Sequence, residues 1–289
     1  MKKILLTTDL AGKSDRALER ALRVAKEQGA SLNILHIVPY YKSGTISGRR
    51  EREAKELIKS MLDKFDGYSH LTINIDVVES KEIYQTILEY AHEIKADLIV
   101  MGLHGKTKFR DLFTGTVIER VIRKGNKPVL MVKEAALDTY QTVIAGIDFA
   151  PASRNALRLA IDLCPRASFE VLHTYFLPNV YASGSSMGVV YVEGVQEVTV
   201  KAHQDTMTAF INTEENFYKK THGQKEIKIP YEISEHDPYR AMVKKVKDRS
   251  ADLITIGAHS KSIVTPSKLG GVAEDILANP PCDVLVLSE

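Results

Sequence analysis

The sequence contains no tryptophan and only two cysteines, Cys164 and Cys282, among 289 residues. Two cysteines cannot form a disulfide framework, and no Cys-x-x-Cys or Cys-x-x-x-Cys spacing offers a thiolate metal site. No run of 18 apolar residues occurs, and the apolar stretch near Met1 is too short for a signal peptide or a membrane span. We therefore expect a soluble, cytoplasmic protein.

The sequence also lacks an excess of charge of either sign. Its 39 Lys and Arg residues nearly balance its 37 Asp and Glu residues, which leaves a net charge of +2. This charge is too small to indicate a nucleic acid or an anionic membrane as a partner. A hydrophobic content of 44% is ordinary for a globular protein, and the length allows two domains that each bury a core.

Several motifs of catalysis and metal binding are absent. There is no His-x-x-x-His pair, and neither cysteine has a sequence context that would activate its thiol. We therefore predict no catalytic residue and no metal ligand from the sequence.

A glycine-punctuated loop is the most informative stretch of the sequence. It begins with Gly102-Leu-His-Gly105 and, after nine residues, continues with Gly115-Thr116. An apolar run at 97–101 precedes it and a helical pattern at 117–122 follows it. Glycines and a helix start together can bind phosphate, because backbone N–H groups approach the anion closely. The alternative is a turn that only needs glycines, since the spacing matches neither common nucleotide motif.

A second copy of this pattern follows. Gly270 lies 13 residues after Gly257 (270 − 257), as Gly115 lies 13 after Gly102 (115 − 102). In both copies a closing apolar strand begins 26 residues after the first glycine, at 128–132 and at 283–287. The chain is therefore a tandem repeat. We place the two domains at residues 1–135 and 141–289, with a short polar linker between them.

Apolar runs and helical patterns alternate in each half. In the first half we expect strands at 3–8, 31–38, 71–78, 97–101 and 128–132, with helices near 14–25, 48–64, 83–94 and 117–122. The second half repeats this order, with about 18 extra residues, much of them in 176–194, before a long helix near 195–221. Strands that alternate with helices predict an α/β fold with a parallel sheet covered on both faces.

An aspartate follows the first strand of each half, at Asp9 and Asp148. Open parallel sheets bind ligands beyond the carboxyl ends of their strands. If the first and fourth strands are neighbours, Asp9 and Gly102 share one crevice, where the carboxylate could bind a ribose hydroxyl or an adenine amino group. The alternative is that Asp9 caps a loop or the first helix. The equivalent histidines His36 and His173 favour a repeated structural role over a metal site.

These residues resemble the universal stress protein family in its tandem-domain form. The pattern Gly-x-x-Gly, nine residues, Gly-Ser/Thr is matched position by position by the first glycine loop, with support from the stretches at 3–9, 35–37 and 97–105. The resemblance implies a doubly wound five-stranded sheet of order 3-2-1-4-5 in each half. It also implies that ATP, alone or with Mg²⁺, is the bound nucleotide. The residues implied to bind it are Thr8, Asp9, Ile37, Gly102, Gly105, Gly115, Thr116 and Val117.

The second half departs from this pattern. Ser260 replaces the second glycine and Gly271 replaces the hydroxyl residue of the motif. We therefore expect one tight ATP site per chain, in the first half. The family resemblance further implies that the two closing strands pair antiparallel, so that the halves form an intramolecular pseudo-dimer, and homodimers could also form.

Two functional classes are compatible with these residues. The first is a nucleotide-responsive stress or regulatory module that binds an adenine nucleotide. The second is a slow ATPase or phosphotransfer enzyme that uses the same site. An efficient enzyme would need a metal ligand and a base positioned beside the phosphates. No spacing in the loop assigns such roles, so we favour the module.

Overall fold

The computed structural model describes residues 1–10, 14–40, 48–103, 116–136, 138–175, 193–258 and 269–288, without the side chains at 14–15 and 193–196. The first half consists of β1 (Lys3–Thr8), α1 (Ser14–Gln28), β2 (Ser31–Pro39), α2 (Gly48–Leu62), β3 (Ile73–Ser80), α3 (Ile83–Glu93), β4 (Leu98–Gly102), α4 (Val117–Lys124) and β5 (Val129–Val132). The second half consists of β6 (Thr142–Gly146), α5 (Pro151–Leu163), β7 (Ser168–Thr174), α6 (Glu193–Thr221), β8 (Tyr231–Ser234), α7 (Pro238–Arg249), β9 (Leu253–Gly257), α8 (Gly271–Ala278) and β10 (Asp283–Leu287).

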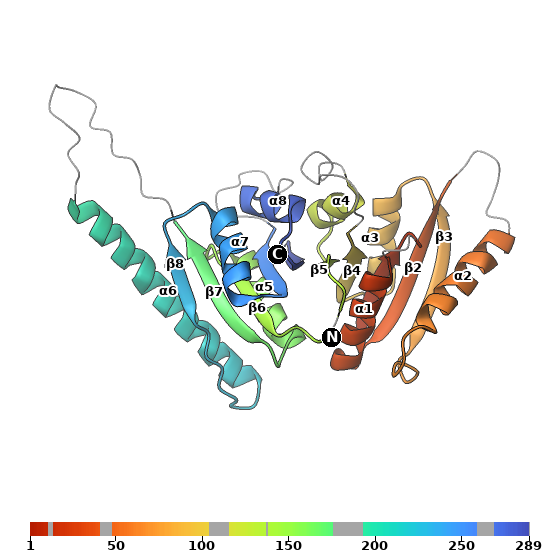
Figure 1. Cartoon of the computed structure of the whole chain (residues 1–289), viewed down its shortest axis with the longest axis horizontal. Coiled ribbons are helices and arrows are strands. Elements are labelled where there is room, and N and C mark those ends of the chain that lie inside the picture. The colour runs from red at the N-terminus through yellow and green to blue at the C-terminus, as the bar shows by residue number, and fades with distance from the viewer. Residues whose placement is uncertain are drawn as a thin grey trace, which may run out of the picture.

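All ten strands form one sheet in the order β3-β2-β1-β4-β5-β10-β9-β6-β7-β8. Each half therefore has the strand order 3-2-1-4-5, as expected. The pairs within each half are parallel, whereas β5 and β10 pair antiparallel with Leu130 opposite Leu285. The two halves lie side by side around these two strands (Figure 1), so the predicted intramolecular pseudo-dimer is confirmed.

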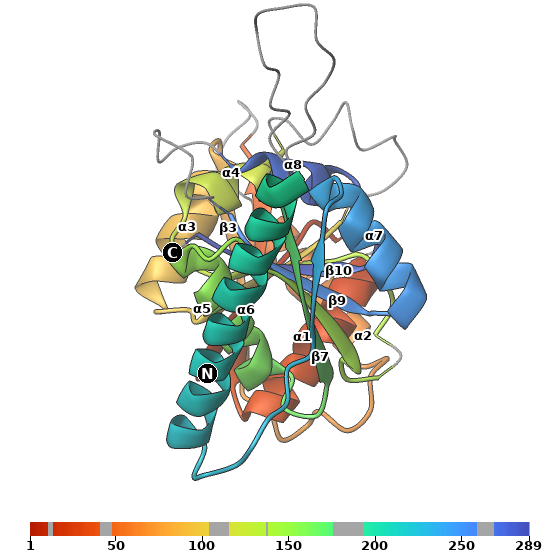
Figure 2. The ribbon, with the colours of Figure 1, turned by 90° about the vertical axis from the view of Figure 1, so that its left-hand side faces the viewer.

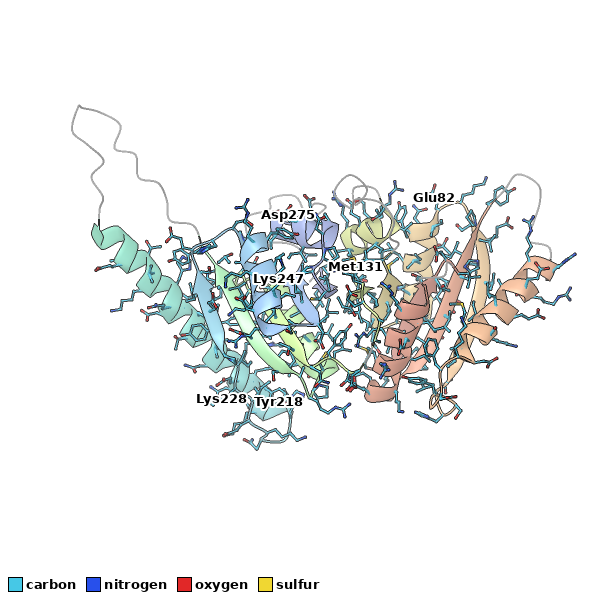
Figure 3. All side chains as sticks on the ribbon, viewed as in Figure 1. Glu82, Met131, Tyr218, Lys228, Lys247 and Asp275 are labelled. Carbon is cyan, nitrogen blue, oxygen red and sulfur yellow. The ribbon has the colours of Figure 1, made fainter. Side chains whose placement is uncertain are left out.

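Helices cover both faces of the sheet because alternate strand residues point to opposite faces. Ile4 and Leu6 of β1 belong to the core beneath α1, α2, α5 and α6, whereas Leu5 belongs to the core beneath α3, α4, α7 and α8. At the boundary between the halves, Met131 of β5 is fully buried near the middle of the molecule (Figure 3). Both cores therefore extend across the boundary between the halves.

The boundaries of β3 differ from the sequence prediction at both ends. β3 begins at Ile73 and not at Leu71, because the Leu71 N–H donates to Tyr68 O in a turn. At its other end β3 continues to Ser80, which pairs with Pro39. The long helix of the second half, α6, begins at Glu193, close to the predicted start, and it runs along the outside of the second half (Figure 2).

The linker is less polar and more firmly held than its sequence suggested. Tyr140 is buried, and its hydroxyl donates to the carboxylate of Asp283 at 2.7 Å. The same carboxylate accepts the backbone N–H groups of Lys133 and Glu134 at 2.8 and 3.0 Å and pairs with Arg20 of α1 at 3.2 Å. Asp283 is completely buried, and this burial raises its pKa against the influence of Arg20. The cluster joins the first half, the linker and the second half at one point.

Candidate functional site

The carboxyl ends of β1 and β4 lie next to each other in the sheet. Thr7 pairs with Met101, so Asp9, just beyond β1, and Gly102, at the end of β4, belong to the same edge. The expectation that the first and fourth strands are neighbours is therefore correct. In this strand order the direction of the chain connections reverses between β1 and β4. Open α/β sheets bind ligands in the crevice at such a switch point.

Two further predicted residues come to the same edge from β1 and β2. Thr8 pairs with His36, and Ile37 follows immediately in β2. The Thr8 hydroxyl oxygen accepts the N–H of Leu10 at 3.1 Å, and the Thr8 carbonyl accepts His36 Nδ1 at 2.8 Å. In the second half, His173 Nδ1 donates in the same way to the carbonyl of Ile147 at 2.7 Å. The repeated structural role expected for the two histidines is thus present in both halves.

The start of α4 supplies the remaining described residues of the predicted site. Thr116 is the N-cap, and its hydroxyl oxygen accepts the N–H of Glu119 at 3.1 Å. An N-cap hydroxyl that accepts through its oxygen still has its own proton to donate to a ligand. Val117 is the first residue of the helix. Gly105 and Gly115, which complete the motif, lie outside the described residues.

Gly102 has a packing role besides any role at the ligand. A Cβ atom at this position would lie 3.2 Å from Cβ of Ala17 in α1. Its counterpart Gly257 is tighter still, because a Cβ there would lie 2.8 Å from the backbone nitrogen of Ser153 in α5. Both glycines therefore allow the first helix of their half to pack directly on the fourth strand.

A left-handed residue follows the aspartate in each half, and no sequence pattern predicted it. Leu10 has φ of 61° and Phe149 has φ of 63°. Positive φ is uncommon for non-glycine residues and is costly for bulky ones. The backbone therefore has the same left-handed residue directly after Asp9 and after Asp148.

A cavity of about 350 Å³ lies in the second half at the position equivalent to the predicted ATP site. It is bounded by the ends of β6, β7 and β9, by α7, and by the start of α8. At its edge, Asp148 Oδ1 accepts the Ser153 hydroxyl at 2.6 Å and the Ala150 N–H at 3.0 Å. The crevice that lost part of the phosphate motif thus retains a cavity.

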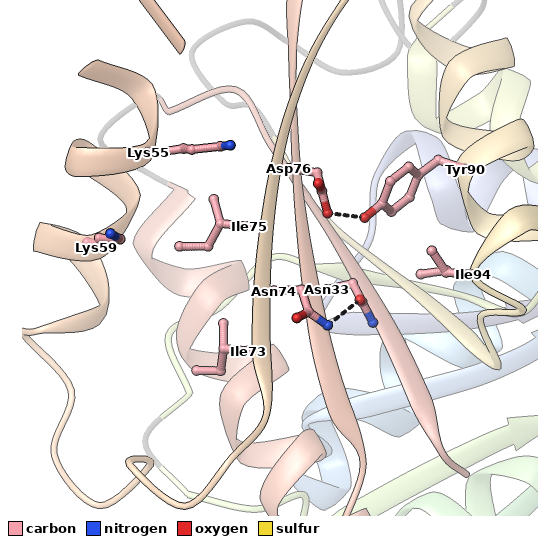
Figure 4. A pocket seen from close by; sticks show the side chains of 9 residues that line it. All are labelled: Asn33, Lys55, Lys59, Ile73, Asn74, Ile75, Asp76, Tyr90 and Ile94. Carbon is pink, nitrogen blue, oxygen red and sulfur yellow. Dashed lines mark hydrogen bonds between the residues drawn. The ribbon is translucent and has the colours of Figure 1, made fainter. Parts of the chain in front are cut away.

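A larger and more open hollow of about 600 Å³ lies at the edge of the sheet in the first half, along β3 (Figure 4). Its polar groups bind one another: Tyr90 donates to Asp76, and Asn74 donates to Asn33 at 3.0 Å. Burial, followed by the bond to Asp76, raises the pKa of the Tyr90 hydroxyl. Because the hollow lies away from the carboxyl ends of the strands, it is a weaker candidate for a ligand site.

His173 also makes a contact that sequence spacing could not reveal. Its Nε2 lies 3.0 Å from Nδ1 of His203 in α6. Because His173 Nδ1 is the donor to Ile147, Nε2 carries the lone pair and His203 Nδ1–H is the donor when both rings are neutral. Phe149 and Tyr175 pack against this pair of rings.

Two features of other functional classes are missing from the described residues. No group of three or more His, Cys, Asp or Glu side chains among them is arranged to hold a metal ion. No helix in the described part of the chain has the length and apolar character needed to cross a membrane.

Comparison with known proteins identifies relatives of both halves. The family model described as the universal stress protein family matches residues 1–133 and again residues 139–288. A universal stress protein of Methanocaldococcus jannaschii is 33% identical over 142 residues, which cover 46% of this chain and 82% of the relative. A universal stress protein from Mycolicibacterium smegmatis is 22% identical, and this match covers 98% of the present chain and 96% of the relative.

A solved universal stress protein from Archaeoglobus fulgidus shares the fold, with a TM-score of 0.65 and 18% identity, and the match covers 99% of this chain and 95% of that one. The repeated family match, the strand order and the paired halves agree with one another. The chain belongs to the universal stress protein family, as a protein of two tandem family domains.

Proposed function

We propose that the crevice of the first half binds ATP and that the protein is a nucleotide-responsive stress or regulatory module. The observation that carries the proposal is the meeting of three features at one edge of the sheet. Asp9 follows β1, Gly102 ends the neighbouring β4, and Thr116 caps the helix that follows the glycine loop. A carboxylate suits the donors of an adenosine group, and a capped helix start with glycines suits phosphates.

The proposed site consists of Thr8, Asp9, Ile37, Gly102, Gly105, Gly115, Thr116 and Val117. Adenosine would lie near Asp9 and Ile37, and the phosphates would lie at Gly105, Gly115 and Thr116. The second half keeps the strand ends and the helix start, but Gly271 stands where Thr116 stands in the first half. We therefore propose one tight ATP site per chain.

Titration calorimetry with ATP tests this proposal. Wild-type protein should bind about one ATP per chain, and Gly115→Val should weaken binding at least tenfold, which corresponds to about 1.4 kcal/mol. A branched side chain would fill the space that a phosphate needs. The matched control is Gly271→Ala, where an added Cβ meets open space, and it should leave the tight site unchanged.

Two equal sites, or a tight site that survives Gly115→Val, would contradict the assignment. A single-turnover hydrolysis assay, with Thr116→Ala as its control, separates the module from a slow ATPase. If ATP is hydrolysed by wild-type protein and not by Thr116→Ala, the enzyme is the better description.

A further inference from the structure

The cavity of the second half has walls that are mostly apolar. Leu172 of β7, Met242 of α7 and Ile256 of β9 line it. Its volume of about 350 Å³ lies within the range of pockets that hold small molecules, which are typically apolar with a few convergent polar groups. Walls of this kind favour a flat or compact ring over a chain of charged groups.

Asp148 presents a fixed acceptor to this cavity. Its Oδ1 is held by the hydroxyl of Ser153, which is buried, and by the N–H of Ala150. No hydrogen bond to the other carboxylate oxygen, Oδ2, is found among the described residues, so this oxygen is available to a donor on a ligand. Because Ser153 fixes the orientation of the carboxylate, little side-chain freedom would be lost on binding.

A second polar group distinguishes this crevice from the first. Thr174 lines the cavity at the position that Ile37 occupies in the first half, one residue after the equivalent histidines. The hydroxyl can donate and accept. Where the ring of a ligand would lie, the second crevice therefore has one more hydrogen-bonding side chain than the first crevice has.

The cavity offers a phosphate less than the first crevice does. Asp148 is the only charged side chain among the described residues that line it. Gly271 supplies no hydroxyl at the helix start, although the described residues provide no acceptor for the N–H groups of Gly271 and Val272. These donors suffice for a neutral acceptor such as a ring nitrogen or a hydroxyl oxygen. A triphosphate would find neither the hydroxyl that Thr116 supplies in the first half nor a cation among those lining residues.

We propose that this cavity is a second ligand site that takes an uncharged ring compound bearing an amino or hydroxyl group, and that it selects against nucleotide triphosphates. The ring lies between Leu172, Met242 and Ile256, its donor binds Asp148, and its acceptor faces the start of α8. The second site is built from residues of the second half alone, so its test remains readable if the first crevice does not bind ATP.

Adenosine is a suitable probe, with ATP as its charged counterpart. Both are titrated into a first-crevice variant that carries Asp9→Asn and Gly115→Val, so that binding there reports the second half. We expect adenosine to bind one site per chain at least tenfold more tightly than ATP. Adding Asp148→Asn should weaken adenosine binding at least tenfold. The asparagine amide can present an N–H donor at the point where the amino group of the ligand needs an acceptor.

Thr174→Val preserves side-chain shape and removes only the hydroxyl, and it should weaken adenosine severalfold in the same background. This second change keeps the test decisive if Asp148→Asn lowers the thermal unfolding midpoint. Adenosine that fails to bind the first-crevice variant would overturn the inference. ATP binding as tight as adenosine binding would also overturn the inference. An adenosine affinity that stays unchanged in both Asp148→Asn and Thr174→Val would overturn it as well.

Discussion

Single residues at the strand ends hold the backbone in the shape that the crevices need. In each half a histidine of the second strand donates to a carbonyl at the end of the first strand, from His36 to Thr8 and from His173 to Ile147. In each half the next turn contains a left-handed residue. These contacts fix the turn beside the aspartate, so the carboxylate is positioned before any ligand arrives.

The protonation of His173 makes stability depend on pH. Burial, reinforced by the neighbouring His203, lowers the pKa of His173 from its usual 6.5, although the Ile147 carbonyl and Asp148 act in the opposite direction. The folded protein therefore keeps this ring neutral at pH values where the unfolded chain protonates it. As the pH falls below about 6.5, proton uptake favours unfolding, by at most about 1.4 kcal/mol per pH unit.

Urea unfolding at pH 7.5 and pH 5.5 measures this effect. Wild type should lose more stability over this interval than His173→Gln, in which the titrating ring is absent. His70→Gln, at an exposed histidine, should lose as much as wild type. Equal losses of unfolding free energy in wild type and His173→Gln would show that the contact of His173 with His203 does not resist protonation.

Among the elements, α6 depends on a small number of anchors. Of its described side chains, those before Met207 are exposed or only partly buried, whereas Met207, Phe210 and Ile211 enter the core. Glu214 is buried on the same helix and binds Arg158 of α5 through two bonds of 2.6 and 3.1 Å, with Arg154 at 3.3 Å. Charge pairing therefore fixes the helix where it crosses α5.

Removing the buried carboxylate should release this helix. We expect Glu214→Ala to lower the free energy of unfolding by about 1–3 kcal/mol, because two partly exposed guanidinium groups lose their buried partner. Limited proteolysis should then cut within α6 faster than in wild type. Glu197→Ala, at an exposed position of the same helix, should change stability by less than about 0.5 kcal/mol. Matching effects of the two substitutions would show that the ion pairs do not anchor α6.

The sequence was sufficient to predict the elements but not their tertiary contacts. The strands were recognisable because both faces of a parallel sheet are buried, which produces continuous apolar runs such as Lys3–Thr8. The start of β3 was misplaced because the turn at Tyr68 is set by a backbone bond that leaves no apolar signature. At α7 the local sequence explains the helix start, because Asp237 is the N-cap and Pro238 is the first helical residue.

The repeat located the candidate crevices, because equal spacings in the two halves identify equivalent strand ends. It could not reveal the contact of His173 with His203, since residues 30 apart meet only through the packing of α6. Nor could it show that Tyr140 is buried against Asp283, 143 residues further along the chain. Contacts of this kind depend on tertiary packing and have no local pattern.

At the scale of the whole molecule, the two halves complete one another. β5 would be an open apolar edge in an isolated first half, and β10 covers it. Further contacts cross the boundary, including Arg166 with Glu27 at 2.5 Å and the Ser288 hydroxyl with the Ile122 carbonyl at 3.1 Å. The second half therefore occupies the edge of the first half that would otherwise be open to pairing with another chain.

Residues 1–135 expressed alone should therefore self-associate or aggregate, because an uncovered apolar edge strand pairs with another chain. Light scattering over a range of concentrations would measure this. The full chain provides the comparison, since its β5 edge is already paired. A half-chain that remains monomeric and folded at high concentration would show that β5 needs no partner.

The antiparallel joint between β5 and β10 also affects how this protein can change. In a homodimer of identical chains, every substitution occurs twice, so a change that improves one crevice alters the other as well. Covalent linkage keeps the two halves at a fixed ratio and a high effective concentration, so neither can lose its partner by dilution. Each half can therefore acquire its own ligand preference independently, while both still contribute to a single stable sheet.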